Sequence, residues 1–440
     1  MLQTLRSAWK LVDLRRKIIF TLFILLMYRI GNAIPVPYIN VDLLQTHFAS
    51  LQNTVLGLMN VMSGGAFSRA TIFALSIQPY INASIIMQLL TIAIPALERL
   101  QRDGGEEGKK KIAAITRYAT VGIGLIQGFA FYILIRNGYT STTGASVPLL
   151  NQTGIWPAVV IILTFTAGSA LMMWLGEQIT EFGIGNGVSI LLFASIISRF
   201  PPAVYNMFGN VARGVTTWYA VVLMLLGGLA IIVLIVLVNN AERRIPIQYS
   251  KRVVGRKLYG GQSTHLPMKV NMSGVMPIIF AQTLTSLPAT ILMMFGITST
   301  SGGFWGGFLA VYNSNTILYA AVYMLLIVGF SYFYATIQFN PIEIANNLRK
   351  NGGFIPGYRP GKPTSDFIKR VLNKVTIFGA IYLGIVAVVP IIITVFSTTA
   401  KDSGVSLGGT SIIIVVGVAL ETVRALESEM LMRHYKGFLE

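Results

Sequence analysis

The chain has 440 residues, of which 54% are apolar and only 11% are charged, whereas soluble domains contain about 25% charged residues. This composition excludes an ordinary soluble protein. The absence of cysteine excludes disulfides and thiolate metal sites, and the three scattered residues His47, His265 and His434 lack the spacing of metal ligands.

Ten apolar segments predict ten membrane-spanning helices, because about 20 apolar residues cross the hydrocarbon core of a bilayer. In chain order they are residues 18–36, 71–95, 117–136, 156–175, 184–199, 217–238, 272–295, 316–337, 375–397 and 410–427. The first segment follows Arg15, Arg16 and Lys17, as the apolar core of a signal peptide does. No small-residue cleavage pattern follows it, so we expect a retained helix.

The formal charge of +18 is concentrated in alternate loops. Of the 34 Lys and Arg residues, 28 lie in residues 1–17, 98–117, 176–186, 239–269, 338–374 and 424–440, five lie in the intervening loops, and Arg29 lies near the end of the first segment. Cytoplasmic loops carry such an excess, which predicts that these segments and both termini are cytoplasmic. The segment 176–186 is the exception, because it carries Glu177 and Glu181 and no cation.

The apolar segments contain almost no ionisable residues, whereas coupled transporters usually keep such groups at membrane depth. The polar residues there are mostly neutral, as Asn82 and Gln282 are, and are typical of hydrogen bonds between helices. Two alternatives stay open. A secondary transporter would take up a small solute without a motor. An intramembrane enzyme would need a nucleophile with a base, or a metal cluster, and neither pattern is visible.

Two of the basic loops, residues 239–269 and 338–374, are unusually long. Orientation in the membrane alone accounts for basic loops. The second loop also contains a glycine- and proline-defined turn, Gly352–Gly361, that presents Arg359. This pattern indicates a docking surface for a large acidic partner, such as RNA or a motor protein.

Several motifs, in this order and at these spacings, resemble the SecY family of channel subunits of the bacterial protein-secretion translocon. They are Met62–Gly65, Phe73–Leu75, Gln78–Ile86, Trp174–Glu181, Gly183–Gly187, Gln262–Pro267, Lys269–Asn271, Phe339–Pro341, Pro356–Pro360 and Gly408–Ser411. The resemblance covers nearly the whole chain.

The resemblance implies an all-α polytopic membrane protein with ten transmembrane helices in two inverted five-helix halves around a central hourglass pore. The halves would be residues 1–200 and 201–440, in the bacterial cytoplasmic membrane. Two halves of five spans run in opposite directions, and such inverted repeats usually place the working site between them near the midplane.

The resemblance also implies a ring of apolar side chains at the pore constriction. Carried over by motif, the ring is Ile77, Ile81, Val188, Leu192, Ile279 and Ile414. The family favours isoleucine here, so Val188 and Leu192 are departures that keep the ring apolar. Members four residues apart share a helix face. An apolar collar dewets and resists ions, and it has no fixed charge to trap a passing polypeptide.

The remaining implied sites are a plug, a lateral gate and docking loops. The plug would be about residues 57–71, including Met62, Ser63, Gly64 and Gly65. The gate would lie between spans two and three and spans seven and eight, with a polar cluster of Gln88, Gln127 and Asn271. Docking residues would be Arg359, Lys251, Arg252 and Arg256.

Implied partners are SecE, SecG, the SecA ATPase, the ribosome, signal sequences, nascent preproteins and membrane lipids. The resemblance implies no cofactor and no bond chemistry.

Overall fold

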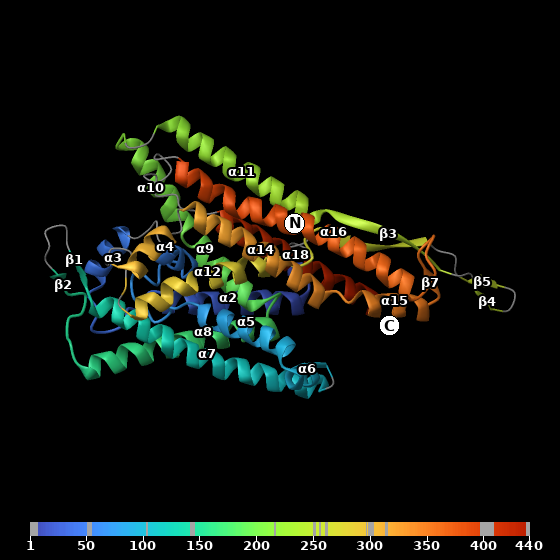
Figure 1. Ribbon diagram of the computed structural model, residues 1–440, viewed down its shortest axis with the longest axis horizontal. Helices are drawn as coiled ribbons and strands as arrows, with labels where there is room; N and C mark the ends of the chain where they lie inside the picture. The colour runs from blue at the N-terminus through green and yellow to red at the C-terminus, as the bar shows by residue number, and fades with distance from the viewer. Residues whose placement is uncertain are drawn as a thin grey trace.

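Long helices that run roughly along one axis dominate the computed structural model of the chain (Figure 1). The structure describes residues 8–50, 55–102, 104–140, 146–214, 217–249, 252–254, 257–259, 263–295, 297, 303–312, 316–396 and 409–436. A helix occupies each of the ten predicted segments. These helices are α2 Val12–Gly31, α5 Gln78–Ala93, α7 Gly105–Arg136, α8 Ile155–Phe182, α9 Gly187–Ile197, α11 Trp218–Asn240, α12 Met276–Met294, α14 Ile317–Gln338, α16 Lys362–Phe396 and α18 Gly409–Lys436.

Six helical stretches within the described ranges are long and apolar enough to cross a membrane, or seven if one bent pair counts as a single span. This makes the chain a multi-pass membrane protein, and the count of ten spans stays a prediction. Shorter helices connect the long ones. They are α3 Val41–Ser50, α4 Val55–Met62, α6 Pro95–Arg102, α10 Phe200–Ala212, α13 Phe304–Val311 and α15 Pro341–Lys350.

The second span differs from its predicted bounds of 71–95. Residues 71–77 form turns, with Ser76 at φ +53°, and α5 begins only at Gln78. Its other end comes at Ala93, because Pro95 disfavours helical backbone at the preceding residue, and Ile94 is extended. The following helix, α6, is bent by 105° from α5. The apolar run therefore combines a turn segment, a membrane helix and part of a surface helix.

A close crossing of α8 and α9 explains the glycine-rich segment Gly183–Gly187. The Thr180 hydroxyl donates to the Gly176 carbonyl and accepts the Gly187 N–H, both at 2.9 Å. The Asn186 side chain caps α9 by accepting the Ser189 N–H at 3.3 Å. A Cβ on Gly187 would overlap the Gly176 carbonyl oxygen, so this position requires glycine.

Gly187→Ala should therefore destabilise the fold by about 1–3 kcal/mol, the usual cost of overpacking. Thermal unfolding of the purified protein in detergent measures the loss. The matched control is Gly227→Ala, because Gly227 lies in the membrane helix α11 and a methyl group added there would have no neighbour within 4 Å. Equal unfolding temperatures for the two variants would contradict the close crossing.

Both long basic loops fold together at one end of the molecule. Strand β3 Glu242–Tyr249 pairs antiparallel with β6 Ser263–Lys269 and with β7 Gly353–Phe354, and β4 Arg252–Val254 pairs with β5 Lys257–Tyr259. A buried cluster unites the two loops. Its members are Ile245, Ile247, Met268, Leu348, Ile355, Ile368 and Leu372. We call this end, with α6 and α15, the basic end.

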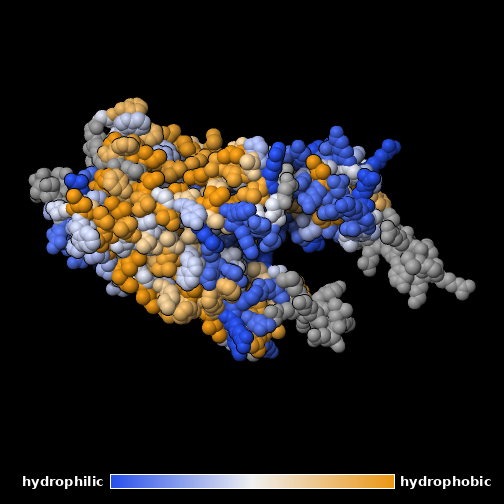
Figure 2. Space-filling model, turned by 90° about the horizontal axis from the view of Figure 1, so that it is seen from below, coloured by the Kyte–Doolittle hydropathy of each residue, from blue (hydrophilic) through white to orange (hydrophobic). Residues whose placement is uncertain are grey.

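The opposite end carries α3, α4, α10 and the short strands β1 Tyr139–Thr140 and β2 Ser146–Val147 (Figure 1). Figure 2 shows apolar residues over most of the surface between the ends and hydrophilic residues gathered at the basic end. The apolar interior contains one cluster from residues 36–165, one from residues 235–413, and a central cluster that draws on both parts of the chain.

Candidate functional site

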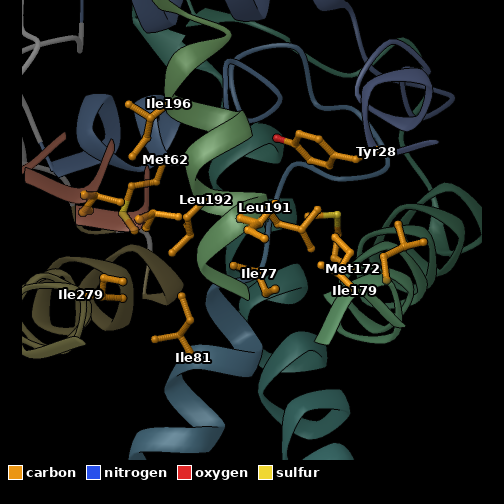
Figure 3. Packing of buried hydrophobic residues seen from close by; sticks show 14 of the residues in the cluster. Tyr28, Met62, Ile77, Ile81, Met172, Ile179, Leu191, Leu192, Ile196 and Ile279 are labelled. Atoms are coloured by element: carbon orange, nitrogen blue, oxygen red, sulfur yellow. The ribbon is translucent and has the colours of Figure 1, made fainter. Parts of the chain in front are cut away.

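A buried apolar cluster lies where four helices from both halves of the chain meet. It contains all six predicted ring residues, which we call the central collar. Five are almost fully buried, with exposed fractions from 0% for Ile77 and Leu192 to 3% for Ile81, and Val188 packs against them partly buried. Figure 3 shows Ile77, Ile81, Leu192 and Ile279 close together.

Each collar residue lies near the start of its helix. Ile77 and Ile81 flank the first turn of α5, and Val188 and Leu192 lie in the first two turns of α9. Ile279 and Ile414 occupy the first two turns of α12 and α18. Helix α5 leads to α6 at the basic end, whereas α9 leads to α10 at the opposite end. The collar is thus built from helices that run in opposite directions.

The predicted plug segment packs against the central collar. Helix α4 ends at Met62, which is 2% exposed within the central cluster and accepts a hydrogen bond on its sulfur from the Gln78 side chain at 3.5 Å. Ser63 is also buried, and its hydroxyl accepts the Phe67 N–H. Gly64 and Gly65 have φ of +67° and +88°, conformations that favour glycine.

The glycines allow the plug segment to approach α9 closely. A Cβ on Gly64 would lie 3.0 Å from the Ser195 carbonyl oxygen, and one on Gly65 would lie 2.9 Å from an Arg199 nitrogen. The structure therefore brings the four predicted plug residues together against α5 and α9. Their helix is shorter than the predicted segment of 57–71, because Gly64 and Gly65 end the helical backbone.

Tyr28 of α2 fastens the plug segment to α9, a role that sequence reasoning missed. Its hydroxyl lies 2.7 Å from Ser195 Oγ and 3.3 Å from the Ser63 carbonyl oxygen. The Tyr28 hydroxyl donates to the Ser63 carbonyl, and either hydroxyl can be the donor in its contact with Ser195. The Tyr28 ring stacks on Phe73 at 6.0 Å. A lone tyrosine in an apolar helix could have indicated such a contact from the sequence, since its hydroxyl needs a hydrogen-bond partner when buried.

Two of the predicted gate residues lie on the expected helices and Asn271 precedes the third, and all three have different partners. Helix α12 packs against both α5 and α7. On α5, Gln88 is a hydrogen-bond partner of the Tyr334 hydroxyl on α14. On α7, the buried Gln127 has no partner for its Oε1 among the described residues. Asn271 precedes α12 and donates to Asn239 Oδ1 at 3.0 Å.

The three gate residues therefore do not form a hydrogen-bonded cluster among themselves. Instead, α12 carries buried acceptors without partners among the described residues, as α7 does. Gln282 and Thr283 are buried on α12, and their side-chain oxygens make no hydrogen bond to any residue that the structure describes. Neutral polar groups of this kind stabilise a helix contact weakly, which suits a contact that must separate.

At the basic end, Arg359 is exposed on a rigid turn. Ile355 anchors the turn in the loop cluster, and the Tyr358 ring packs on Phe367 of α16 at 4.2 Å. The Thr364 hydroxyl holds the Arg359 carbonyl at 2.8 Å. Burial and the nearby Arg424 lower the pKa of Lys269, at the end of β6.

The other predicted docking residues come between β3 and β6 in the sequence. Arg252 lies in β4, and its side chain is outside the described residues. Lys251 and Arg256 also lie outside them. Within the described ranges, no group of His, Asp and Glu could hold a metal ion.

Comparisons with known proteins agree with this architecture. The family model SecY matches residues 71–423. The protein translocase subunit SecY of Streptomyces scabiei is 43% identical over 446 residues, and that of Mycobacterium tuberculosis strain H37Rv is 42% identical over 448 residues. Both alignments cover 100% of this chain and 100% of the relative.

Solved structures of channels share the fold. A structure described as a protein conducting channel matches with a TM-score of 0.66 at 18% identity, covering 94% of this chain and 92% of the other. Sec61 in a canine ribosome–channel complex matches with a TM-score of 0.60 at 17% identity, with the same coverage. The expected helical membrane-channel fold is thereby confirmed.

Proposed function

Because this chain belongs to the SecY family and is the channel subunit of a protein translocase, we propose that its central collar is the constriction through which unfolded preproteins cross the membrane. One observation carries this proposal. Four helices from both halves place six apolar side chains in one buried cluster, and the plug residue Met62 lies in the same cluster. A narrow apolar collar of this kind excludes ions by dewetting and still releases a passing chain.

The plug segment is the resting seal of this channel. Its buried position is supported by Tyr28, which holds Ser63 against α9, and by the close contacts of Gly64 and Gly65. A chain that enters the collar displaces Met62 and breaks these contacts. Because each buried hydrogen bond is worth about 0.5–1.5 kcal/mol, the seal is weak enough to open.

Tyr28→Phe should loosen the seal and raise the resting ion leak of vesicles containing the channel by roughly threefold to tenfold. The ring and its stacking on Phe73 remain, so the fold should not change. The matched control is Tyr118→Phe on α7, because Tyr118 is 79% exposed. A leak equal to that of the unchanged channel would contradict the role of Tyr28.

The contact of α12 with α5 and α7 serves as the lateral gate toward lipid. A side-chain oxygen is buried without a partner among the described residues in Gln127 on α7 and in Gln282 and Thr283 on α12. Such groups make the helix contact easy to separate. An apolar segment gains about 0.3–0.6 kcal/mol for each Leu, Ile, Phe or Val that it places at the membrane centre. A signal-peptide core of roughly 7–15 residues offsets the few interactions lost on opening.

The basic end is the cytoplasmic docking surface, with both termini on the same side. Arg359 and the segment between β3 and β6 are the contacts for the SecA ATPase and for the ribosome. SecE and SecG complete the channel complex. The chain itself catalyses no bond chemistry, and SecA or the ribosome supplies the driving force.

Transport into sealed vesicles tests the function directly. Vesicles containing the chain with SecE and SecG, supplied with SecA and ATP, should protect a secretory precursor from added protease. Vesicles without the chain are the control. Uptake of a small solute by the chain without SecA, together with no protection of the precursor, would favour a secondary transporter instead.

A further inference from the structure

A cavity of about 470 Å³ lies at the opposite end of the molecule, between α2, the plug segment and the start of α10. This volume is far above the roughly 10–15 Å³ that a single water requires. Three arginines from three separate segments line it, namely Arg29, Arg69 and Arg199. The central collar and the gate do not use this cavity.

No carboxylate among the described residues forms an ion pair with any of the three guanidinium groups. The sequence contains no acidic residue between Asp42 and Glu98, or between Glu181 and Glu242, the stretches that contain Arg69 and Arg199. Arg69 and Arg199 also repel one another, and Arg199 is half-buried. Unpaired cations held together in this way attract an anion.

A buried amide provides a second, independent indication of a ligand. Asn32 lines the cavity and is 6% exposed, and its side-chain amide makes no hydrogen bond of ordinary geometry to any described residue. Its polar neighbour is the Tyr28 hydroxyl, which interacts with the amide only beyond that geometry and already bonds to Ser63 and Ser195. Buried polar groups are normally paired, so this amide beside three guanidinium groups can complete its hydrogen bonds with a bound acceptor.

We propose that this cavity binds a phosphate-type oxyanion, held by Arg29, Arg69, Arg199 and the Asn32 amide. Guanidinium groups form paired, charge-assisted hydrogen bonds with phosphate oxygens, and three of them suit a phosphate group better than a single carboxylate. The headgroup of an anionic phospholipid and free phosphate share this chemistry.

The bound anion would also join the plug segment to the channel wall. Arg69 belongs to the turns that follow the plug helix, whereas Arg199 immediately precedes α10 and Arg29 lies in the last turn of α2. An oxyanion among them removes their repulsion and holds the plug in its closed position. This consequence rests on the proposed function of the plug, whereas the binding site does not.

Native mass spectrometry of the full channel complex in detergent tests the site, with phosphatidylglycerol, phosphatidylcholine and inorganic phosphate as separate probes. Retention of phosphatidylglycerol over phosphatidylcholine identifies a lipid headgroup as the source, and binding of inorganic phosphate alone identifies the free anion. In either case Arg69→Gln and Arg199→Gln should weaken binding about tenfold. Arg213→Gln is the control, because Arg213 is exposed at the same end, outside the cavity.

The proposal would be overturned if neither phosphatidylglycerol nor inorganic phosphate bound, or if Arg213→Gln weakened binding as much as the cavity variants do. If Arg199→Gln does not fold, Arg69→Gln supplies the measurement, since Arg69 is exposed in a turn. Ion leak from vesicles separates the two parts of the proposal. The ion leak of the unchanged channel should fall when the identified anion is added. The ion leak of the Arg69→Gln channel should be the same with and without the anion. Intact binding with an unresponsive leak overturns only the effect on the plug.

Discussion

Arg359→Glu is expected to abolish SecA-driven secretion while leaving the protein folded and inserted in the membrane. Arg359 is exposed, and its turn is held from below by Ile355 and by the packing of Tyr358 on Phe367. The substitution therefore changes the surface charge and leaves the anchoring contacts intact. Like charges placed together across an interface cost several kcal/mol, which corresponds to a loss of about a hundredfold or more.

Protease protection of a secretory precursor in vesicles measures this effect, and the amount of chain in the membrane reports insertion. Arg349→Glu is the matched control, because Arg349 is exposed at the same end but lies in α15 rather than in the turn. Similar losses in both variants would indicate general loss of positive charge. Normal secretion by Arg359→Glu would remove Arg359 from the docking surface.

Replacing two collar residues, Ile81→Ser with Ile279→Ser, should raise the ion leak of the resting channel at least about tenfold. Ile81 is 3% exposed and Ile279 is 1% exposed in the central cluster, and they come from opposite halves of the chain. Two hydroxyls in place of apolar groups let water wet the constriction, and a wetted pore conducts ions. Conductance across planar bilayers containing the purified complex measures the change.

The control is Leu229→Ser on α11, because Leu229 is 61% exposed on the apolar surface. This substitution introduces the same hydroxyl into a membrane helix away from the collar, so its leak should not change. A resting conductance in the double variant no higher than in the control would contradict the collar assignment.

The sequence alone locates the helices well, because membrane spans carry a strong signal in composition. The prediction for residues 217–238 differs from α11 by at most two residues at either end. The prediction for residues 71–95 fails at its start, since apolar content cannot distinguish the turn residues before Gln78 from a helix. Pro95 marks the C-terminal end of this helix, because a proline disfavours helical backbone at the residue before it.

Contacts between distant segments cannot be predicted from composition. The sequence indicates two separate basic loops, yet Gln248 pairs with Phe354 and joins them in one sheet. Strand register of this kind depends on packing between elements far apart in the chain. The same holds for Tyr28, whose partners Ser63 and Ser195 lie 35 and 167 residues away.

Family motifs, rather than physical reasoning, locate the collar in the sequence. Apolar residues four apart, such as Val188 and Leu192, occur in any membrane helix, and only the fold brings them against Ile77 and Ile279. The lateral gate is a site where carrying family motifs over to this chain does not predict the contacts. The resemblance predicts one polar cluster of Gln88, Gln127 and Asn271, but Asn271 bonds to Asn239 near the end of α11.

The central claim is that a polypeptide passes through the collar. Its most direct test is crosslinking from photoreactive residues at positions 81, 192 and 279 to a precursor arrested during transport, compared with positions 223 and 229 on the exposed face of α11. We predict strong crosslinks from the three collar positions and none from α11. Crosslinks of equal strength at all five positions, or none at the collar, would contradict the account.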